Sequence, residues 1–224
     1  MRSCKNAVLF LIFISLMVGC AKKNEGVIEY KITYKQSKED NPLINLMPTS
    51  MEYYFKDRKI LTQIEGWMGV FKSIQISDLS DSSNVLLMKL LDKKYYYRRS
   101  LSELPLDFED LKIDNIEYLS EPIDFKGYKC KQVRIKMADS LNSEYLFYYT
   151  NDIPVLEPNR NNPFKEIPGV LMRFNMSLQG LSLQLEFENY RDTVFPESVF
   201  KIPSDYKEIS REEMNQFFNE LNAM

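Results

Sequence analysis

The side chains that most often carry out chemistry are scarce in this sequence. Histidine is absent altogether, which excludes Ser-His and Cys-His nucleophile pairs and removes the commonest ligand of transition metals. The sequence also has no G-x-S-x-G elbow, no C-x-x-C pair and no Walker-type phosphate loop. Carboxylates, lysines and tyrosines could still catalyse a reaction, but their spacing indicates none. We therefore expect no enzyme activity, no catalytic residue, no metal and no cofactor.

One pair of carboxylates, Asp78 and Asp81 in the stretch SDLSDSSN, has a spacing that could contact a cation. Asp and Ser side chains also bond readily to nearby backbone groups, so a solvated turn is the commoner use of such a stretch. We expect the turn.

Cysteine is the remaining reactive residue type, and Cys20 has the most informative position. Arg2 and Lys5 precede an apolar run over residues 7–18 that ends just before Gly-Cys. Twelve helical residues rise about 18 Å, which is too short for a bilayer core of roughly 30 Å, so the run indicates an export signal. The ending LMVGC resembles the bacterial lipobox, which implies cleavage before Cys20 and lipid attachment to its sulfur. An ordinary signal peptide with a chance cysteine is the alternative.

This interpretation divides the chain into a lipoprotein signal peptide over residues 1–19, a tether over 20–26 and a single β-rich domain over 27–224. Ala21 rather than Asp follows the cysteine, which in lipoproteins of this kind implies transfer to the outer membrane. We expect a protein of the cell envelope that is lipid-anchored through its acyl chains, in the outer membrane and facing the periplasm.

Charge and cysteine content narrow the expected partners. The mature chain would lose two of its 29 basic residues and keep all 32 acidic ones. A mildly acidic surface does not favour nucleic acid, which requires a basic patch. With Cys4 removed and Cys20 lipidated, Cys130 has no intramolecular partner, so we expect no disulfide. A small buried thiol is a commoner state for such a residue than a reactive one.

Alternation with period two dominates the sequence and predicts a sheet. Ile28, Tyr30, Ile32 and Tyr34 share one face of the first strand. Hairpins are predicted over residues 51–67 with a turn at 56–58, over 84–99 with a turn at 92–94, and over 170–188 with a turn near Gly180. Further strands fit residues 70–77, 116–122, 128–137, 144–150 and 197–202. A slip in the alternation near Lys131 and Gln132 predicts a bulge.

Two segments depart from this pattern. Residues 151–169 contain four prolines, which predicts a loop, ordered or mobile, rather than a strand. Near the C-terminus, Ser210 with Glu213 three residues later forms a capping box, which predicts a helix. Its apolar stripe consists of Met214, Phe217, Phe218 and Leu221.

The 170–187 hairpin directs nine large apolar side chains to one side of the sheet. The C-terminal helix cannot cover them, even if short helices form near 43–46 and 106–111. The sheet must either close on itself as a sandwich or barrel, or curl and leave a cavity. A curled sheet would suit a flexible apolar ligand, whereas the plainer alternative is ordinary core packing. The candidate ligand-binding residues are Trp67, Met68, Phe71, Val170, Met172, Phe174, Met176, Leu183 and Leu185.

Three short segments resemble the GLPGLI family and a related family of unknown function, both common among exported bacterial proteins. They are GYKC at 127–130, YYTNDIP at 148–154 and IPGVL at 167–171. Some members of these families look like the lipoprotein carrier LolA and its outer-membrane receptor. The resemblance implies a mainly β fold: a single curved antiparallel sheet, a LolA/LolB-like unclosed β-barrel, with a few short helices and a C-terminal helix. It carries over no functional residue.

Two functions fit these observations. One is a lipid-anchored, periplasm-facing lipoprotein that binds an apolar ligand, of acyl or lipid type, in the hollow of the curved sheet. The alternative is a non-catalytic structural or partner-docking lipoprotein of the envelope, since tyrosine-rich segments such as 95–99 also suit contacts with an envelope protein. A cavity above about 300 Å³ would favour binding, and a filled interior would favour docking.

The assignment of Cys20 is directly testable. The Cys20→Ser variant lacks the sulfur that would carry the lipid, so we expect an unprocessed or soluble product. Partition into detergent after signal removal measures the anchor, and wild-type partition of this variant would contradict the lipobox interpretation.

Overall fold

The computed structural model describes residues 24–36, 47–66, 69–103, 112–138, 143–178 and 181–222. The predicted signal peptide, Cys20, the short helices near 43–46 and 106–111, and the candidates Trp67 and Met68 lie outside the described residues.

The described residues form one curved sheet of 12 strands that is not closed into a barrel, and 58% of these residues lie in strands. This confirms the predicted fold class. The strands are β1 (Glu25–Tyr34), β2 (Ser50–Lys56), β3 (Lys59–Gly66), β4 (Phe71–Asp78), β5 (Ser83–Leu90), β6 (Lys93–Ser100), β7 (Ile113–Phe125), β8 (Tyr128–Met137), β9 (Glu144–Thr150), β10 (Val170–Leu178), β11 (Leu181–Arg191) and β12 (Lys207–Glu208). A 3-10 turn, η5 (Glu197–Phe200), and a C-terminal helix, α2 (Arg211–Asn222), complete the described elements.

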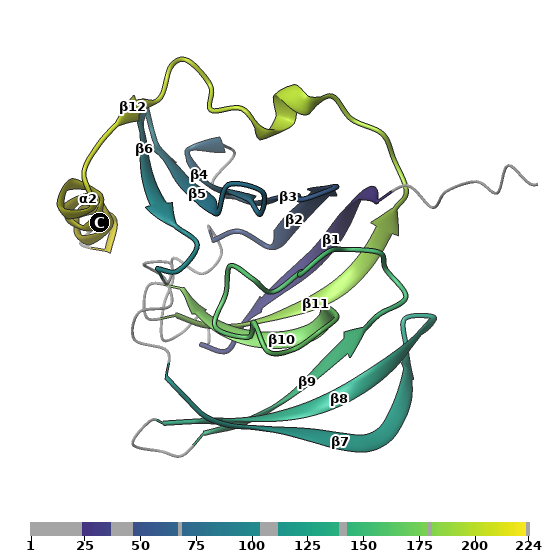
Figure 1. Ribbon diagram of the computed structural model, residues 1–224. Coiled ribbons are helices and arrows are strands. Elements are labelled where there is room, and N and C mark those ends of the chain that lie inside the picture. Colours follow the sequence, from purple (N-terminus) through teal and green to yellow (C-terminus); the bar gives the residue numbers. More distant parts are fainter. Residues whose placement is uncertain are drawn as a thin grey trace, which may run out of the picture.

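The first strand lies in the middle of the sheet. The strand order is β12-β6-β5-β4-β3-β2-β1-β11-β10-β9-β8-β7, so β2 to β6 extend to one side of β1. The chain then crosses to the far edge, and β7 to β11 return to pair with β1 on its other side. All neighbours are antiparallel except β12, which pairs with β6 in parallel. Figure 1 shows the two halves of the sheet curling toward each other around an interior.

Tight turns close the hairpins near the predicted positions. Asp57 occupies the left-handed region with φ 51° in the turn between β2 and β3, and Lys126 and Gly127 do so with φ 51° and 84° between β7 and β8. The turn between β5 and β6 is at Leu91 and Asp92 rather than at 92–94, because Leu90 pairs with Lys93 and Leu91 takes φ 58°.

Two local predictions require correction. The bulge lies in β7 rather than in β8: Leu119 pairs with Gln132 and Ile123 with Cys130, so that residues 120–122 stand opposite Lys131 alone. Pro122 has no N–H to offer a ladder, which favours a bulge there. Residues 197–202 form no strand; the turn η5 begins after Pro196, and the Val199 N–H donates to the Pro196 carbonyl at 3.1 Å.

Three hydrophobic clusters cover the two faces of the sheet. The largest lies on the inner face of β1, β2 and β8 to β11 and includes Ile28, Phe147, Met172, Leu185 and Phe187. Helix α2 covers the inner face of β5 and β6, where Met214 and Phe217 pack on Leu86, Met88, Leu90 and Tyr97.

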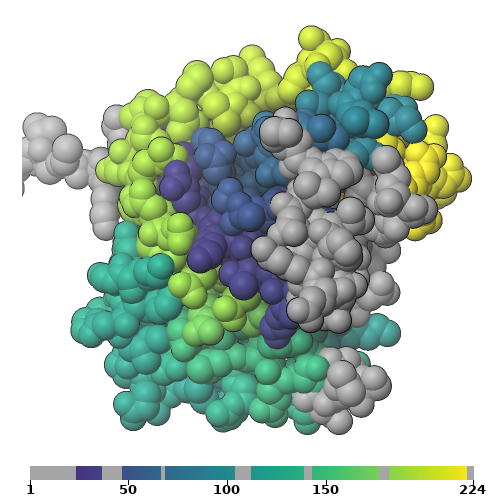
Figure 2. Space-filling view, turned by 180° about the vertical axis from the view of Figure 1, so that it is seen from behind, coloured from purple at the N-terminus to yellow at the C-terminus, as the bar shows by residue number. Residues whose placement is uncertain are grey.

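The outer face of β3 to β6 is also apolar. Leu61, Ile76, Val85 and Leu87 are buried there beneath the segment 192–206, which we call the strap, through Val199, Phe200, Ile202 and Tyr206. Figure 1 shows the strap arching from the end of β11 over this face to β12 and α2. In the view from behind, the strap lies at the opposite end of the molecule from β7 to β9 (Figure 2).

The predicted capping box forms at the start of α2. The Ser210 N–H donates to Glu213 Oε2 at 2.8 Å, and the Glu213 N–H donates to Ser210 Oγ at 3.2 Å. These reciprocal bonds lower the pKa of the Glu213 carboxyl and satisfy backbone donors that the helix itself leaves free. Among the described residues, no helix is long and apolar enough to span a bilayer.

The capping box should contribute to the stability of the whole domain, because α2 covers the inner face of two strands. We expect Ser210→Ala to lower the free energy of unfolding by about 1 kcal/mol, measured by urea denaturation. Ser204→Ala is the matched control, since Ser204 lies exposed in the turn before β12. An equal loss in both variants would contradict a capping role.

Candidate functional site

The proline-rich segment 151–169, which we call the plug, fills much of the space inside the curled sheet. Ile153, Phe164 and Ile167 are each no more than 3% exposed, and the Phe164 ring lies edge-on to Phe147 of β9 with centroids 4.8 Å apart. The predicted loop is therefore a packed part of the core.

Hydrogen bonds hold the plug in its folded shape and to the sheet. The Asn159 side chain is buried and its Nδ2 donates to the carbonyls of Ile167 and Gly169 at 2.7 and 2.9 Å. The Tyr53 hydroxyl donates to the Pro158 carbonyl at 3.1 Å. A Cβ at Gly169 would collide with the Thr150 carbonyl oxygen, so only glycine fits where the plug joins β10.

The three segments that resemble the GLPGLI pattern meet at the base of the plug. Thr150 at the end of β9 donates through Oγ1 to the Lys129 carbonyl of β8 at 2.9 Å, and Tyr149 pairs with Leu171 of β10. Cys130 next to this junction is fully buried. In this structure the motif residues pack and bond to one another, which is a structural role.

A cavity of about 110 Å³ remains between the plug and the inner face of the sheet. Side chains of β1, β2 and β10 form one wall, which is mostly apolar. The polar face of β4 forms the other together with β3, where Thr62 lies between Ile60 and Ile64, and the plug closes one side. The lining residues are Tyr30, Met51, Tyr53, Ile60, Thr62, Ile64, Ser73, Gln75, Ser77, Leu86, Pro158, Asn159, Asn161, Asn162, Val170, Leu171, Phe174 and Met176.

The structure separates the predicted ligand-binding residues into groups. Val170, Phe174 and Met176 line the cavity. Three others are buried in the core and do not line it: Met172, Leu183 and Leu185. Phe71 packs with the cluster beneath α2, and Trp67 and Met68 lie outside the described residues.

The polar wall is a feature that sequence reasoning missed. Ser73, Gln75 and Ser77 of β4 face the cavity together with Thr62 of β3, with which Gln75 pairs. In the segment FKSIQISD the isoleucines at 74 and 76 face outward instead, where the strap covers them. The alternation of β4 is visible in the sequence, but the strap that permits its inverted orientation is not.

A buried polar cluster lies at the plug end of this wall. Asn161 Nδ2 donates to Ser77 Oγ at 2.7 Å, and Arg99 Nη2 donates to Asn161 Oδ1 at 2.7 Å. Asn84 also bonds to Asn161 and donates to Ser77 Oγ at 3.3 Å. The cluster fixes Asn161 at the cavity wall, because both polar atoms of the Asn161 side chain have partners on β4, β5 or β6.

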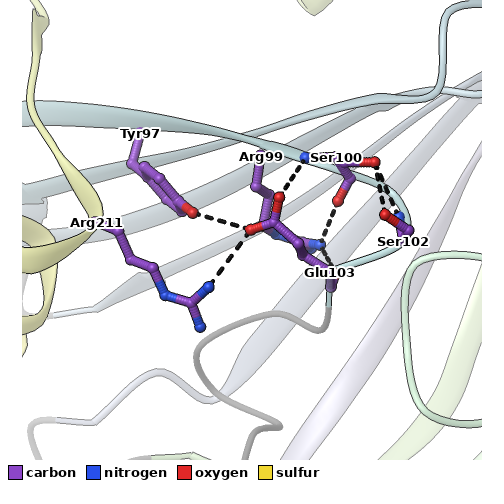
Figure 3. Close-up of polar contacts among 6 residues, drawn as sticks. All are labelled: Tyr97, Arg99, Ser100, Ser102, Glu103 and Arg211. Atoms are coloured by element: carbon purple, nitrogen blue, oxygen red, sulfur yellow. Dashed lines mark hydrogen bonds and ion pairs between the residues drawn. The ribbon is translucent and has the colours of Figure 1, made fainter.

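Arg99 connects this cluster to the start of α2. It bonds to the carbonyl of Glu103, and the Glu103 carboxylate accepts from the Tyr97 hydroxyl at 3.3 Å and pairs with Arg211 of α2 at 3.4 Å (Figure 3). The Ser100 N–H donates to the same carboxylate at 3.3 Å. These contacts hold the turn after β6 against the helix.

Asp78 and Asp81, whose spacing could suit a cation, form the expected turns. Asp78 accepts from the Ser80 N–H at 2.8 Å, and Asp81 accepts from the Ser83 N–H at 2.9 Å. Hydrogen bonding with the Ser83 side chain, and then with its backbone, lowers the pKa of Asp81. No group of three or more His, Cys, Asp or Glu residues in the described ranges could hold a metal ion.

Three buried acids on the inner face favour their protonated forms. Burial raises the pKa of the Cys130 thiol from 9.0 to about 11 and raises the pKa of Tyr30 and Tyr53 above 10.0. Each tyrosine hydroxyl also donates to a carbonyl, Tyr30 to Leu171 at 2.9 Å and Tyr53 to Pro158 at 3.1 Å.

Stability should therefore fall in alkaline solution. In the unfolded chain these groups ionise near their ordinary pKa values, whereas the folded protein keeps them protonated. Their contribution to the free energy of unfolding is therefore complete below about pH 9 and declines as the pH rises to 11. We expect a loss of up to about 1.4 kcal/mol per pH unit for each group, measured by urea unfolding. In Cys130→Ala the part of the decline that begins near pH 9 should disappear. A free energy of unfolding that stays constant from pH 8 to 10.5 would contradict this.

Comparisons with known proteins give a likeness of fold. The chain matches no protein-family model and no curated protein. A solved structure of PNGF-II is similar with a TM-score of 0.52 and 10% identity, over 87% of this chain and 32% of that one. This chain thus spans about a third of the length of PNGF-II, and the likeness shows the fold alone. An outer membrane lipoprotein-sorting protein domain from Vibrio parahaemolyticus has a TM-score of 0.22 and 12% identity, over 79% of this chain and 89% of that domain, a similarity too low to carry an argument.

Proposed function

We propose that this protein is a lipid-anchored envelope lipoprotein that binds an acyl-type ligand in the hollow of its curved sheet. The observation that supports the proposal is the cavity between the plug and the sheet, with Val170, Phe174 and Met176 on its apolar wall. Apolar surface of this kind gains from contact with methylene groups by about 0.8 kcal/mol for each one buried. The proposed anchor at Cys20 would place the hollow close to a source of acyl chains.

The size of the cavity limits how the ligand can bind. A volume of about 110 Å³ equals that of roughly four water molecules in the liquid and is below the roughly 300–1,000 Å³ of pockets that enclose drug-sized ligands. We therefore propose that only part of the ligand enters, while the remainder passes out beside β3 and β4. The lining residues Thr62, Ser73 and Gln75 of these strands are partly exposed, so the cavity is accessible there.

A structural or partner-docking lipoprotein is the second candidate function. The small cavity and the packed plug favour it, because most of the inner face is covered by the protein's own side chains. Tyr118 of β7 and Leu146 of β9, 49% and 41% exposed on opposite faces of the sheet, offer apolar surface to an envelope protein partner. A binding measurement distinguishes the two functions.

A charge on the apolar wall should weaken binding. We expect Met176→Asp to raise the Kd for an environment-sensitive fluorescent acyl ester by about tenfold or more, because a carboxylate there must be desolvated when the acyl group enters. Met176 is only partly buried, so this variant perturbs folding less than a charge at the fully buried Met172. Fluorescence titration measures the Kd, and circular dichroism checks the fold.

The matched control is Thr33→Asp, which adds the same charge on the exposed outer face of β1 and should leave the Kd unchanged. If the wild-type protein binds no acyl ester, the binding proposal falls and the docking function stands. If both variants weaken binding equally, the probe does not bind in the cavity.

A further inference from the structure

The cavity has two chemically different walls, which a site for an acyl chain alone would not need. Thr62, Ser73 and Gln75 line one part of it, beside the apolar Ile60 and Ile64 of β3, and Val170, Phe174 and Met176 of β10 line another. Within the described ranges, no hydrogen bond engages the side chains of Thr62, Ser73 or Gln75. A ligand made only of methylene groups would remove water from these side chains without replacing its hydrogen bonds, at a cost of about 1–3 kcal/mol for each buried group. A ligand with hydrogen-bonding groups of its own avoids this cost.

The charge of the cavity wall restricts those groups further. Among the lining residues described, none is Lys, Arg, Asp or Glu. Arg99 is the cation close by, and it reaches Asn161 Oδ1 at 2.7 Å rather than lining the cavity. Burying a carboxylate or a phosphate here would take it from water without an opposite charge on the wall, which is costly. An uncharged head group exchanges its hydrogen bonds with water for hydrogen bonds with the wall, which costs less free energy than burying a charge.

The volume also favours a head group. About 110 Å³ suffices for a few hydroxyl-bearing carbons and the methylenes next to them, but not for a whole acyl chain. Gln75 lies in the middle of the polar wall, flanked by Ser73 and Ser77 on the same face of β4. Its amide both donates and accepts hydrogen bonds, as the hydroxyls of Thr62 and Ser73 do, so the wall is matched to hydroxyl or amide groups.

We infer that the cavity selects amphiphiles with an uncharged, hydrogen-bonding head, which contacts the polar wall while the adjoining methylenes contact β10. The inference rests on the proposed function and adds the class of head group. It makes Gln75 a specificity-determining residue, and it implies that free fatty acids, which carry a carboxylate, are poor ligands.

Calorimetric titration of the full chain with two ligands of equal chain length tests this inference. At pH 8 we expect 1-monododecanoylglycerol, whose head is an uncharged diol, to bind about tenfold more tightly than dodecanoate. Both are used below the concentration at which they aggregate. Equal binding, or tighter binding of dodecanoate, overturns the inference and leaves the proposed function in place. If neither ligand binds, both fall.

Two variants locate the preference on the polar wall. Gln75→Leu replaces the amide with an apolar group of similar size, and we expect it to reduce the preference for the glycerol ester to about threefold or less. Gln63→Leu is the matched control, because Gln63 lies on the opposite face of β3, where its Nε2 donates to Glu52 at 3.3 Å; it should retain the wild-type ratio. A ratio that Gln75→Leu leaves unchanged, in a variant that is folded by circular dichroism, overturns the assignment to Gln75.

Discussion

An open, curled sheet has an apolar inner face that its own strands do not close, and the structure depends on covering that face. A closed barrel would cover it with its opposite wall, but here β7 and β12 are the two ends of the sheet. The plug covers the middle of the face with Phe164 and Ile167, and α2 covers the part at β5 and β6 with Met214 and Phe217. The cavity is the space that remains between the plug and the sheet.

The polar wall of the cavity is possible because the sheet is covered on both sides. A strand with an apolar outer face would normally expose it to water, which is unfavourable. The strap removes this cost for β4, since Val199, Phe200 and Ile202 bury its outer side. Ser73, Gln75 and Ser77 are then free to face the interior. A remote segment of the chain thus determines the chemistry of the inner site.

Local signals in the sequence predicted the strands and the caps, whereas contacts between distant segments were not predictable. The alternation in 170–187 and the Ser210–Glu213 box act over a few residues, and both are present. Proline content correctly predicted that 151–169 forms no strand, but prolines do not reveal that Phe164 packs on Phe147. Similarly, the pattern of 197–202 suits a strand, yet those residues follow Pro196 and serve to cover β4. Three of the predicted ligand-binding residues line the cavity, but the irregularity in β10 between Leu171 and Arg173 brings Leu171 to it instead of Met172. The polar wall was missed because only tertiary contacts orient β4.

The central position of β1 has a mechanical consequence. In a chain attached to a membrane through Cys20, as proposed, the segment from Cys20 to Glu25 extends at most about 18 Å, so any pull on the anchor reaches β1 directly. This strand is hydrogen-bonded on both sides, to β2 and to β11, and Glu25 at its start forms an ion pair with Lys56 at 3.3 Å and accepts from the Phe195 N–H at 2.8 Å. Force along β1 would shear two ladders at once instead of opening one bond after another. The domain is thus held at a strand that is paired along both of its edges.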